Sequence, residues 1–355
     1  MSNVPAALRL ACAALALAAV CAHASPSPEC IVPAKPGGGF DLTCKLAQRA
    51  LLEAGLTGQP MRLVYVPGGI GAVAYNSIVA QRPAEPDTIV AFSGGSLLAL
   101  AEGKFGKYGV ADVRWVGALG TDYGMIAVRA DSPYKTLKDL VAALKSDPDQ
   151  VLFGAGGTIG NQDWMKAALV ARQAGVGYKR MRFVGFEGGG EAFTALLGGH
   201  VQAVSGDVSE AAMQLGAGGI RILAVLAERR LPGRLASVPT AREQGYDITW
   251  PILRGFYMGP KVAQADYQRW AGRFERLQAS PAFARLRAEQ GLFPADLGGA
   301  ASLDAYVKDT VRRYGTLAKE FGLVRQAATC ASVRGSSPMP AASPDAAAAA
   351  CSPAP

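Results

Sequence analysis

The sequence predicts an α/β protein with two lobes, and three observations support this fold class. The chain has 355 residues, which is enough for two domains of roughly 100–200 residues each. Hydrophobic residues make up 50% of the chain and charged residues 18%, a balance typical of a globular protein. Short apolar segments that end in glycine-rich turns alternate with segments in which apolar residues recur at helical spacing. This alternation favours strands and helices arranged around parallel sheets.

Three strand–turn–helix units are expected in the first part of the chain. Each begins with a short apolar segment and continues through a glycine-rich turn into a helical pattern. The expected strands are residues 29–33, 62–66 and 88–92, and the helices that follow them are residues 42–54, 72–81 and 97–102.

A second set of elements repeats this alternation. A helix is expected after Thr136, because Thr136 can cap it and Asp139 follows three residues later, as in a capping box. Glycine-rich turns at residues 154–160 and 186–191 each lead into a further helix. The expected strands are residues 115–119, 125–129, 151–153, 182–184, 201–204 and 221–226, and the helices include residues 161–173 and a segment up to residue 197.

The chain is then expected to return to the first lobe. It does so through a segment at residues 256–258 and a helical region at residues 267–322. Lobe 1 is therefore predicted to contain residues 28–127 and 228–326, and lobe 2 residues 128–227.

The two ends of the chain differ from the rest. Residues 1–24 hold one charge, Arg9, then an apolar run and the sequence Ala-His-Ala, which is typical of a cleaved signal peptide. A membrane-spanning helix needs about 20 apolar residues, and this apolar run is shorter. We therefore expect export to the periplasm without direct membrane insertion. Residues 327–355 are rich in Ala, Ser and Pro, and we expect this low-complexity tail to be disordered.

Charge and cysteine usage exclude several classes of function. The net charge is +8, but the basic residues form no block and are not interleaved with aromatic residues, so no nucleic-acid partner is expected. This surplus of positive charge would help to attract an anion. A contribution to solubility alone explains the surplus equally well. No cysteines or histidines have metal-ligand spacing, so neither a metal nor a cofactor is expected. Cys30 and Cys44 can pair in an oxidising compartment, and the sequence leaves this pairing open.

The glycine-rich turns predict an anion-binding cleft. Helix N-termini carry unpaired backbone N–H groups and a partial positive charge, and glycine lets the backbone approach a ligand closely. Parallel sheets bring such turns together at the carboxyl ends of their strands. For any single glycine-rich turn, the need for a tight turn explains the glycines as well as anion binding does. Five such turns in one chain favour a cleft suited to carboxylates.

Motifs of other functions are incomplete. Residues 69–74 fit the G-x-G-x-x-A dinucleotide pattern, but a secreted protein has little access to NAD. Ser132 and Lys135 match S-x-x-K of acyl enzymes, without the companion motifs. His200 is the only histidine after residue 24. We therefore expect no enzyme, and a secreted hydrolase is the weakest alternative.

A set of short motifs occurs in order along the chain: residues 36–41 (PGGGFD), 67–72 (PGGIGA), 132–139 (SPYKTLKD), 156–163 (GGTIGNQD), 188–192 (GGGEA) and 196–201 (LLGGHV). These motifs resemble those of one family, the TctC/Bug periplasmic receptors of tripartite tricarboxylate transporters. The resemblance extends over residues 28–324. Within this family, the segment at residues 30–44 is similar to the tricarboxylate (citrate-type) receptors.

The resemblance implies a type II periplasmic binding protein, with two Rossmann-like lobes that close on a ligand in the cleft between them. It implies that the loops at residues 36–41 and 156–161 hold a carboxylate through backbone N–H groups. Asp41 would fix the first loop. Lys35 and Arg254 are candidates for additional positive charge, with a solvated surface cation as the alternative for each. The expected ligand-binding residues are Pro36, Gly37, Gly38, Gly39, Phe40, Asp41, Gly68, Gly69, Ala72, Ser93, Ser96, Thr121, Asp122, Gly156, Gly157, Thr158, Gly160, Asn161, Asp207 and Arg254.

The function predicted from these motifs is capture of a tricarboxylate (citrate-like) anion by a monomeric receptor, which delivers it to the membrane subunits of a tripartite tricarboxylate transporter. Two alternatives remain open. The receptor could dock on a sensor protein for signalling, or it could bind a dicarboxylate or another organic acid.

Overall fold

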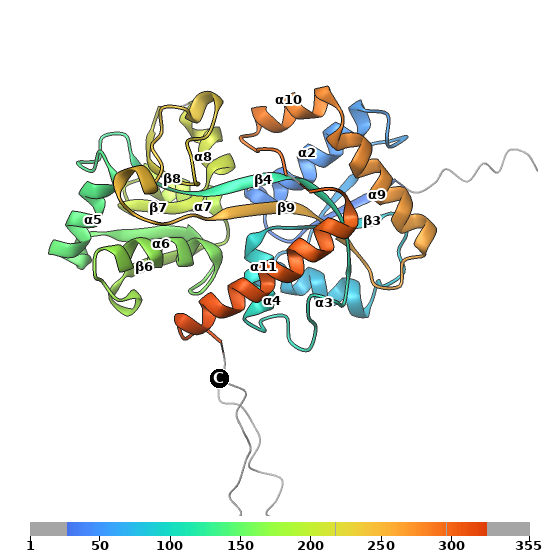
Figure 1. Ribbon diagram of the computed structural model, residues 1–355, viewed down its shortest axis with the longest axis horizontal. Coiled ribbons are helices and arrows are strands. Elements are labelled where there is room, and N and C mark those ends of the chain that lie inside the picture. The colour runs from blue at the N-terminus through green and yellow to red at the C-terminus, as the bar shows by residue number, and fades with distance from the viewer. Residues whose placement is uncertain (1–26, 217, 296, 325–355) are drawn as a thin grey trace, which may run out of the picture. The chain divides into compact units, whose positions relative to one another are not determined.

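The computed structural model describes residues 27–216, 218–295 and 297–324, and their arrangement is drawn in Figure 1. The predicted signal peptide and the low-complexity tail lie outside the described residues. Within them, the strands form one mixed sheet of nine strands in the order β2-β1-β3-β9-β4-β7-β5-β6, with β8 paired to β4. The strands are β1 (Glu29–Val32), β2 (Arg62–Tyr65), β3 (Thr88–Phe92), β4 (Arg114–Arg129), β5 (Leu152–Gly156), β6 (Arg182–Phe186), β7 (Ala203–Asp207), β8 (Ile220–Leu226) and β9 (Pro251–Met258).

The helices lie on both faces of this sheet, in two lobes joined by β4 and β9 (Figure 1). Their bounds are α2 (Gly39–Glu53), α3 (Ala72–Ala80), α4 (Gly94–Ala101), α5 (Leu137–Ser146), α6 (Gln162–Gln173), α7 (Gly189–Leu197), α8 (Val208–Leu215), α9 (Gln264–Gln278), α10 (Pro281–Glu289) and α11 (Ala300–Glu320). Lobe 1 holds β1–β3 with α2–α4, α9 and α10, and lobe 2 holds β5–β8 with α5–α8. Helix α11 packs against α4 of lobe 1 and, through Ala318 and Phe321 near its end, against the apolar core of lobe 2. The α/β class and the two-lobed architecture are as predicted, while the lobe boundaries in residue numbers stay a prediction.

Strand β4 differs from its prediction, because the two expected strands are one. Residues 114–123 pair antiparallel with β9, and residues 124–129 continue in the same strand and pair antiparallel with β7 and β8. Thr121 and Asp122, which fall between the two expected strands, therefore lie inside the single strand. The parallel pairing that we predicted holds within each lobe, for β1 with β2 and β3 and for β5 with β6 and β7.

Apolar side chains fill both faces of the sheet in each lobe. In lobe 1, Phe92 and Trp115 are buried and meet edge to face with ring centroids 4.8 Å apart. In lobe 2, Phe153 and Trp164 are buried in the cluster under α5 and α6. Full burial of each such side chain stabilises the fold by about 1.5–3 kcal/mol.

Local signals place several helix boundaries. Thr136 caps α5 through a capping box with Asp139, as the sequence predicts. Helix α8 has no counterpart among the predicted helices, and the expected helical region at residues 267–322 is divided into α9, α10 and α11. A disulfide joins Cys30 of β1 to Cys44 of α2, with their Cα atoms 5.9 Å apart. It ties the first helix to the first strand of lobe 1.

Candidate functional site

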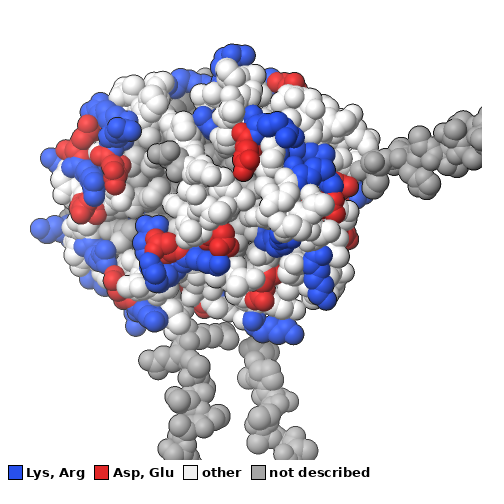
Figure 2. Space-filling model, turned by 45° about the vertical axis from the view of Figure 1, so that its right-hand side comes forward, with Lys and Arg blue, Asp and Glu red and all other residues white. Residues whose placement is uncertain are grey.

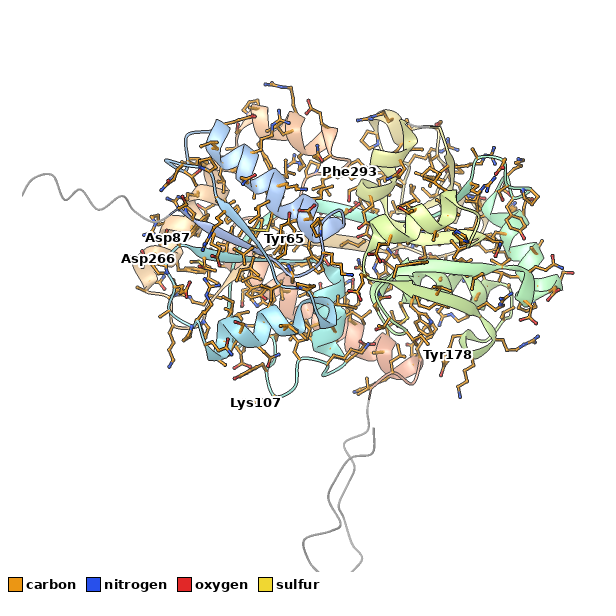
Figure 3. All side chains as sticks on the ribbon, turned by 180° about the vertical axis from the view of Figure 1, so that it is seen from behind. Tyr65, Asp87, Lys107, Tyr178, Asp266 and Phe293 are labelled. Carbon is orange, nitrogen blue, oxygen red and sulfur yellow. A yellow bond between two sulfur atoms is a disulfide. The ribbon has the colours of Figure 1, made fainter. Side chains whose placement is uncertain are left out.

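A cavity of about 950 Å³ lies between loops of the two lobes. Lobe 1 contributes residues that follow β1, β2 and β3, and lobe 2 contributes residues that follow β5 and β6. These are the carboxyl ends of parallel strands, where α/β folds bind ligands. In Figure 3 the two lobes are seen from behind, with their side chains drawn as sticks.

Two helix N-termini from opposite lobes line this cavity. Helix α2 begins at Gly39 and helix α7 at Gly189, and the preceding residues Gly38 and Gly188 offer no side chain to cap them. The first turns of both helices therefore present backbone N–H groups and a partial positive charge to the cavity. An anion between the lobes would be stabilised from both sides.

Glycine is required where the backbones of these loops approach closely. A Cβ atom on Gly156 would lie 2.9 Å from the backbone nitrogen of Gly189. A Cβ atom on Gly39 would lie 2.2 Å from Nη1 of Arg254. A side chain at Gly156 would push the two loops apart, and one at Gly39 would displace the guanidinium group of Arg254, so the glycines permit the tight packing around the cavity.

Asp41 holds the first glycine-rich loop in place from behind. Its carboxylate accepts hydrogen bonds from the backbone of Gly37 at 2.8 Å, from Lys45 at 2.7 Å and from the hydroxyl of Tyr65 at 2.7 Å. Partial burial, together with this hydrogen bond, raises the pKa of Tyr65 to about 12. Tyr65, labelled in Figure 3, lies beside α2. Asp41 thus fixes the loop, as the resemblance implies, and does not itself line the cavity.

A network of buried charges forms one wall of the cavity. Arg254 of β9 donates to Asp122 through Nε at 2.9 Å and Nη2 at 2.6 Å, and Nη2 also lies 2.6 Å from Asp207. Burial lowers the pKa of Arg254, but the Asp122 and Asp207 carboxylates outweigh it and raise the pKa. The positive charge that we expected Arg254 to offer a ligand is therefore already matched by two carboxylates.

Lys166 extends this network into lobe 2. It is fully buried, and its Nζ lies 2.7 Å from Asp207, 2.8 Å from Asp163 and 2.6 Å from the carbonyl oxygen of Gly206. Burial raises the pKa of Asp163 to about 6, although the Lys166 ammonium opposes that shift. For Asp207, burial is outweighed by the Lys166 and Arg254 charges, and its pKa is lowered.

Glu210 is a buried acid that lines the cavity together with Asp163 and Asp207. It lies in α8 of lobe 2, and its Oε1 accepts a hydrogen bond from the backbone N–H of Gly39 in lobe 1 at 2.8 Å. Burial, followed by repulsion from Asp207 and Asp163, raises the pKa of Glu210 to about 8. Glu210 therefore links the lobes through a carboxyl group in an environment unfavourable to its charge.

The structure brings most of the expected site residues together. Those that line the cavity are Gly38, Gly39, Phe40, Gly68, Gly69, Ser93, Gly156, Gly157, Thr158, Asn161, Asp207 and Arg254. Those outside the lining are Pro36, Gly37, Asp41, Ala72, Ser96, Thr121, Asp122 and Gly160.

The residues outside the lining have other partners. Asp122 is fully buried and accepts hydrogen bonds from Arg254 and Ser209. Thr121 pairs through its backbone with Phe293. A Cβ on Gly160 would lie 3.1 Å from Oε1 of Glu102 and 3.2 Å from Nζ of Lys104. Lys35 lies 3.9 Å from Glu191 on the exposed surface and does not line the cavity.

Several lining residues were missed. The glycine-rich turn at residues 186–191 was among the five turns predicted to form the cleft, but none of its residues was among the expected ligand-binding residues. Gln162, Asp163 and Glu210 carry no signal in the sequence, because helical residues of this kind are usually exposed to solvent.

The described residues contain neither a metal-binding cluster nor a membrane-spanning helix. Among the residues that the structure describes, no three His, Cys, Asp or Glu side chains are grouped so as to hold a metal ion. No helix in the described part of the chain is long and apolar enough to span a membrane. On the face drawn in Figure 2, Lys and Arg residues lie beside Asp and Glu residues.

Residues 69–323 match the family described as the tripartite tricarboxylate transporter family receptor, TctC. The chain belongs to this family. The resemblance inferred from the glycine-rich motifs is thereby confirmed. A relative, the UPF0065 protein in the gbd 5' region of Cupriavidus necator, is 24% identical over 331 residues, which cover 89% of this chain and 95% of that protein.

Solved structures confirm the fold of this TctC receptor. The periplasmic binding protein BugD gives a TM-score of 0.76 at 20% identity, covering 84% of this chain and 99% of BugD. MatC from Rhodopseudomonas palustris, solved with bound malate, gives a TM-score of 0.73 at 21% identity, covering 82% of this chain and 98% of MatC. The chain therefore has the two-lobed fold of periplasmic binding proteins.

Proposed function

We propose that this TctC receptor captures a small carboxylate anion between its lobes and delivers it to the membrane subunits of a tripartite tricarboxylate transporter. The observation that carries this proposal is the convergence of the α2 and α7 N-termini, from opposite lobes, on one cavity of about 950 Å³. Backbone N–H groups at helix N-termini are well suited to hold carboxylates.

The mechanism is capture by closure. A ligand that contacts the loops of both lobes binds the closed form more tightly than the open form, and this difference drives closure. Strands β4 and β9 connect the lobes and would carry the hinge motion. Among the residues that the structure describes, those lining the cavity include neither histidine nor cysteine, which supports capture without chemical conversion.

A finer part of the proposal is the number of carboxylate groups on the ligand. The sequence favours a citrate-like tricarboxylate, and this stays a prediction. Arg254 is matched by Asp122 and Asp207, and Lys104 by Glu102 at 2.6 Å, so the cations that line the cavity have carboxylate partners. This pairing supports a ligand with fewer negative charges, and MatC, which shares the fold, was solved with the dicarboxylate malate. A dicarboxylate is therefore our second candidate.

Family membership supports export to the periplasm, and the sequence of residues 1–24 supports a signal peptide as the route. Delivery to transporter subunits would follow from docking of the closed form.

Titration calorimetry of the protein from residue 25 onward tests the proposal. The panel contains monocarboxylates, dicarboxylates and tricarboxylates. We expect one-to-one binding of at least one of them, accompanied by compaction in solution scattering. Folded, ligand-free protein that binds none of them would overturn the substrate class, and binding without compaction would overturn the closure mechanism.

A further inference from the structure

Glu210 occupies a position in the cavity that a ligand carboxylate would otherwise favour. Its side chain comes from α8 in lobe 2, and its Oε1 accepts the N–H of Gly39 at the start of α2 in lobe 1. A Cβ on Gly189, at the start of α7, would lie 2.0 Å from its Oε2. The protein's own carboxyl group therefore lies between the two helix N-termini that make the cleft attractive to anions.

The buried charges around Glu210 are unbalanced. Two cations, Lys166 and Arg254, share this part of the described structure with more carboxyl groups than they can neutralise. The buried carboxyl groups of the network are those of Asp122, Asp163, Asp207 and Glu210. The raised pKa of Glu210 is caused by burial and by the adjacent Asp207 and Asp163 carboxylates. One further positive charge would balance Glu210.

A different acceptor in the same cavity has no hydrogen-bond donor. Gln162 lines the cavity and is only 7% exposed, and its Oε1 accepts no hydrogen bond. Its Nε2 faces Asp207, at 3.3 Å from Oδ2. A buried acceptor left without a donor costs about 1–3 kcal/mol, so a ligand that donates to Gln162 would gain affinity.

These features describe a cavity wall that favours donor groups on the ligand. Building on the proposed capture of a carboxylate, we propose that the ligand also carries an ammonium group, which binds Glu210. The ligand carboxylates then lie against the glycine-rich loops of the cleft. A hydroxyl group at this position would leave the excess negative charge of the network, whereas an ammonium group would reduce it. Glu210 is thus a specificity-determining residue that favours an aminocarboxylate over a plain di- or tricarboxylate.

A matched series of four-carbon ligands tests this proposal. Succinate, malate and aspartate share the carbon chain and two carboxylates, and differ at one carbon by hydrogen, hydroxyl or ammonium. We expect aspartate to bind the protein about tenfold or more tightly than the other two, because hydrogen bonds between charged groups are the stronger class. Glu210→Gln keeps an acceptor for Gly39 but removes the charge, so it should abolish this preference. Glu53→Gln, at the exposed end of α2, should leave it unchanged.

Proton release supplies a readout that does not depend on any variant. The charged groups that act most strongly on Glu210 are Asp207 and Asp163, which oppose its ionisation, and Arg254 and Lys166, which favour it. An ammonium group bound beside Glu210 would be a further positive charge that, like Arg254 and Lys166, favours ionisation of Glu210. Aspartate binding near pH 7 should therefore release a proton, detected by calorimetry in buffers of different ionisation enthalpy, and succinate binding should not.

The outcomes separate this proposal from the proposed function. Binding of succinate or malate at least as tightly as aspartate would overturn the ammonium contact and leave carboxylate capture intact. A preference for aspartate that persists in folded Glu210→Gln, or aspartate binding without proton release, would overturn the role of Glu210. If the panel of carboxylates and all three four-carbon ligands fail to bind, both proposals are overturned.

Discussion

Arg254 of β9 and Asp207 at the end of β7 form a buried ion pair, with Nη2 and Oδ2 2.6 Å apart. Arg254 lies opposite Gly120 of β4 in the sheet, whereas Asp207 belongs to lobe 2. The pair therefore connects the strand that crosses between the lobes to the wall of the cavity.

Replacing Arg254 should destabilise the protein strongly. Arg254→Met leaves Asp122 and Asp207 buried without their cation, and breaking a buried pair in this way costs about 3–5 kcal/mol. Urea denaturation measures the loss. Arg172→Met is the control, because Arg172 and Glu320 are both exposed and 3.9 Å apart, and such pairs contribute about 1 kcal/mol or less. Equal losses in the two variants would contradict this account.

A side chain at Gly156 should weaken ligand binding. The Cβ of Gly156→Ala would lie 2.9 Å from the backbone nitrogen of Gly189, so the loops around the cavity must separate. We expect affinity for the best ligand of the carboxylate panel to fall about tenfold or more, measured by calorimetry, which corresponds to about 1.4 kcal/mol. Gly177→Ala is the control, since nothing lies within 4 Å of its Cβ position and its φ of −65° suits alanine. Unchanged affinity in Gly156→Ala would show that the loops do not need this contact.

The disulfide between Cys30 and Cys44 should stabilise lobe 1. The two cysteines are 14 residues apart, and closing a loop of this length contributes about 3 kcal/mol. The double variant Cys30→Ala/Cys44→Ala should unfold at lower urea concentration than the oxidised protein. Reductant should lower the midpoint of the wild-type protein only, and a similar effect on the double variant would show that other groups respond to the reductant.

Stability should depend on pH through Glu210. Its pKa is about 8 in the folded protein and 4.5 ordinarily, so between these values the folded state binds more protons than the unfolded state. The contribution of Glu210 to stability is therefore fully present below pH 4.5 and is lost as pH rises to about 8. Glu210→Gln lacks this titration. The difference in unfolding free energy between wild type and Glu210→Gln should thus move against the wild type from pH 5 to pH 8, and a constant difference across this range would refute the shift.

Much of the architecture was predictable because its signals are local. A strand followed by glycines and a helical pattern identifies β1 and α2, and Thr136 with Asp139 marks the start of α5. The two loops at residues 36–41 and 156–161 were predicted to meet, and both contribute to the cavity lining. These features depend on backbone conformations that neighbouring residues dictate.

Long-range pairing was not predictable in the same way. Thr121 and Asp122 look like turn residues, yet β9 and then β7 and β8 pair along the whole of β4 and keep it extended. The sequence contains no local mark of this continuity, because the hydrogen-bonding partners lie far away along the chain.

The sequence by itself determined the α/β class, the glycine-rich loops and the family, since each of these is written in short runs of neighbouring residues. Only the tertiary structure decided the charge inside the cleft. Lys166 and Glu210 look like exposed helical residues until the packing of α6 and α8 against the sheet buries them beside Arg254. Burial turns their charges into strong interactions, and which charges meet is decided by the three-dimensional contacts between distant segments.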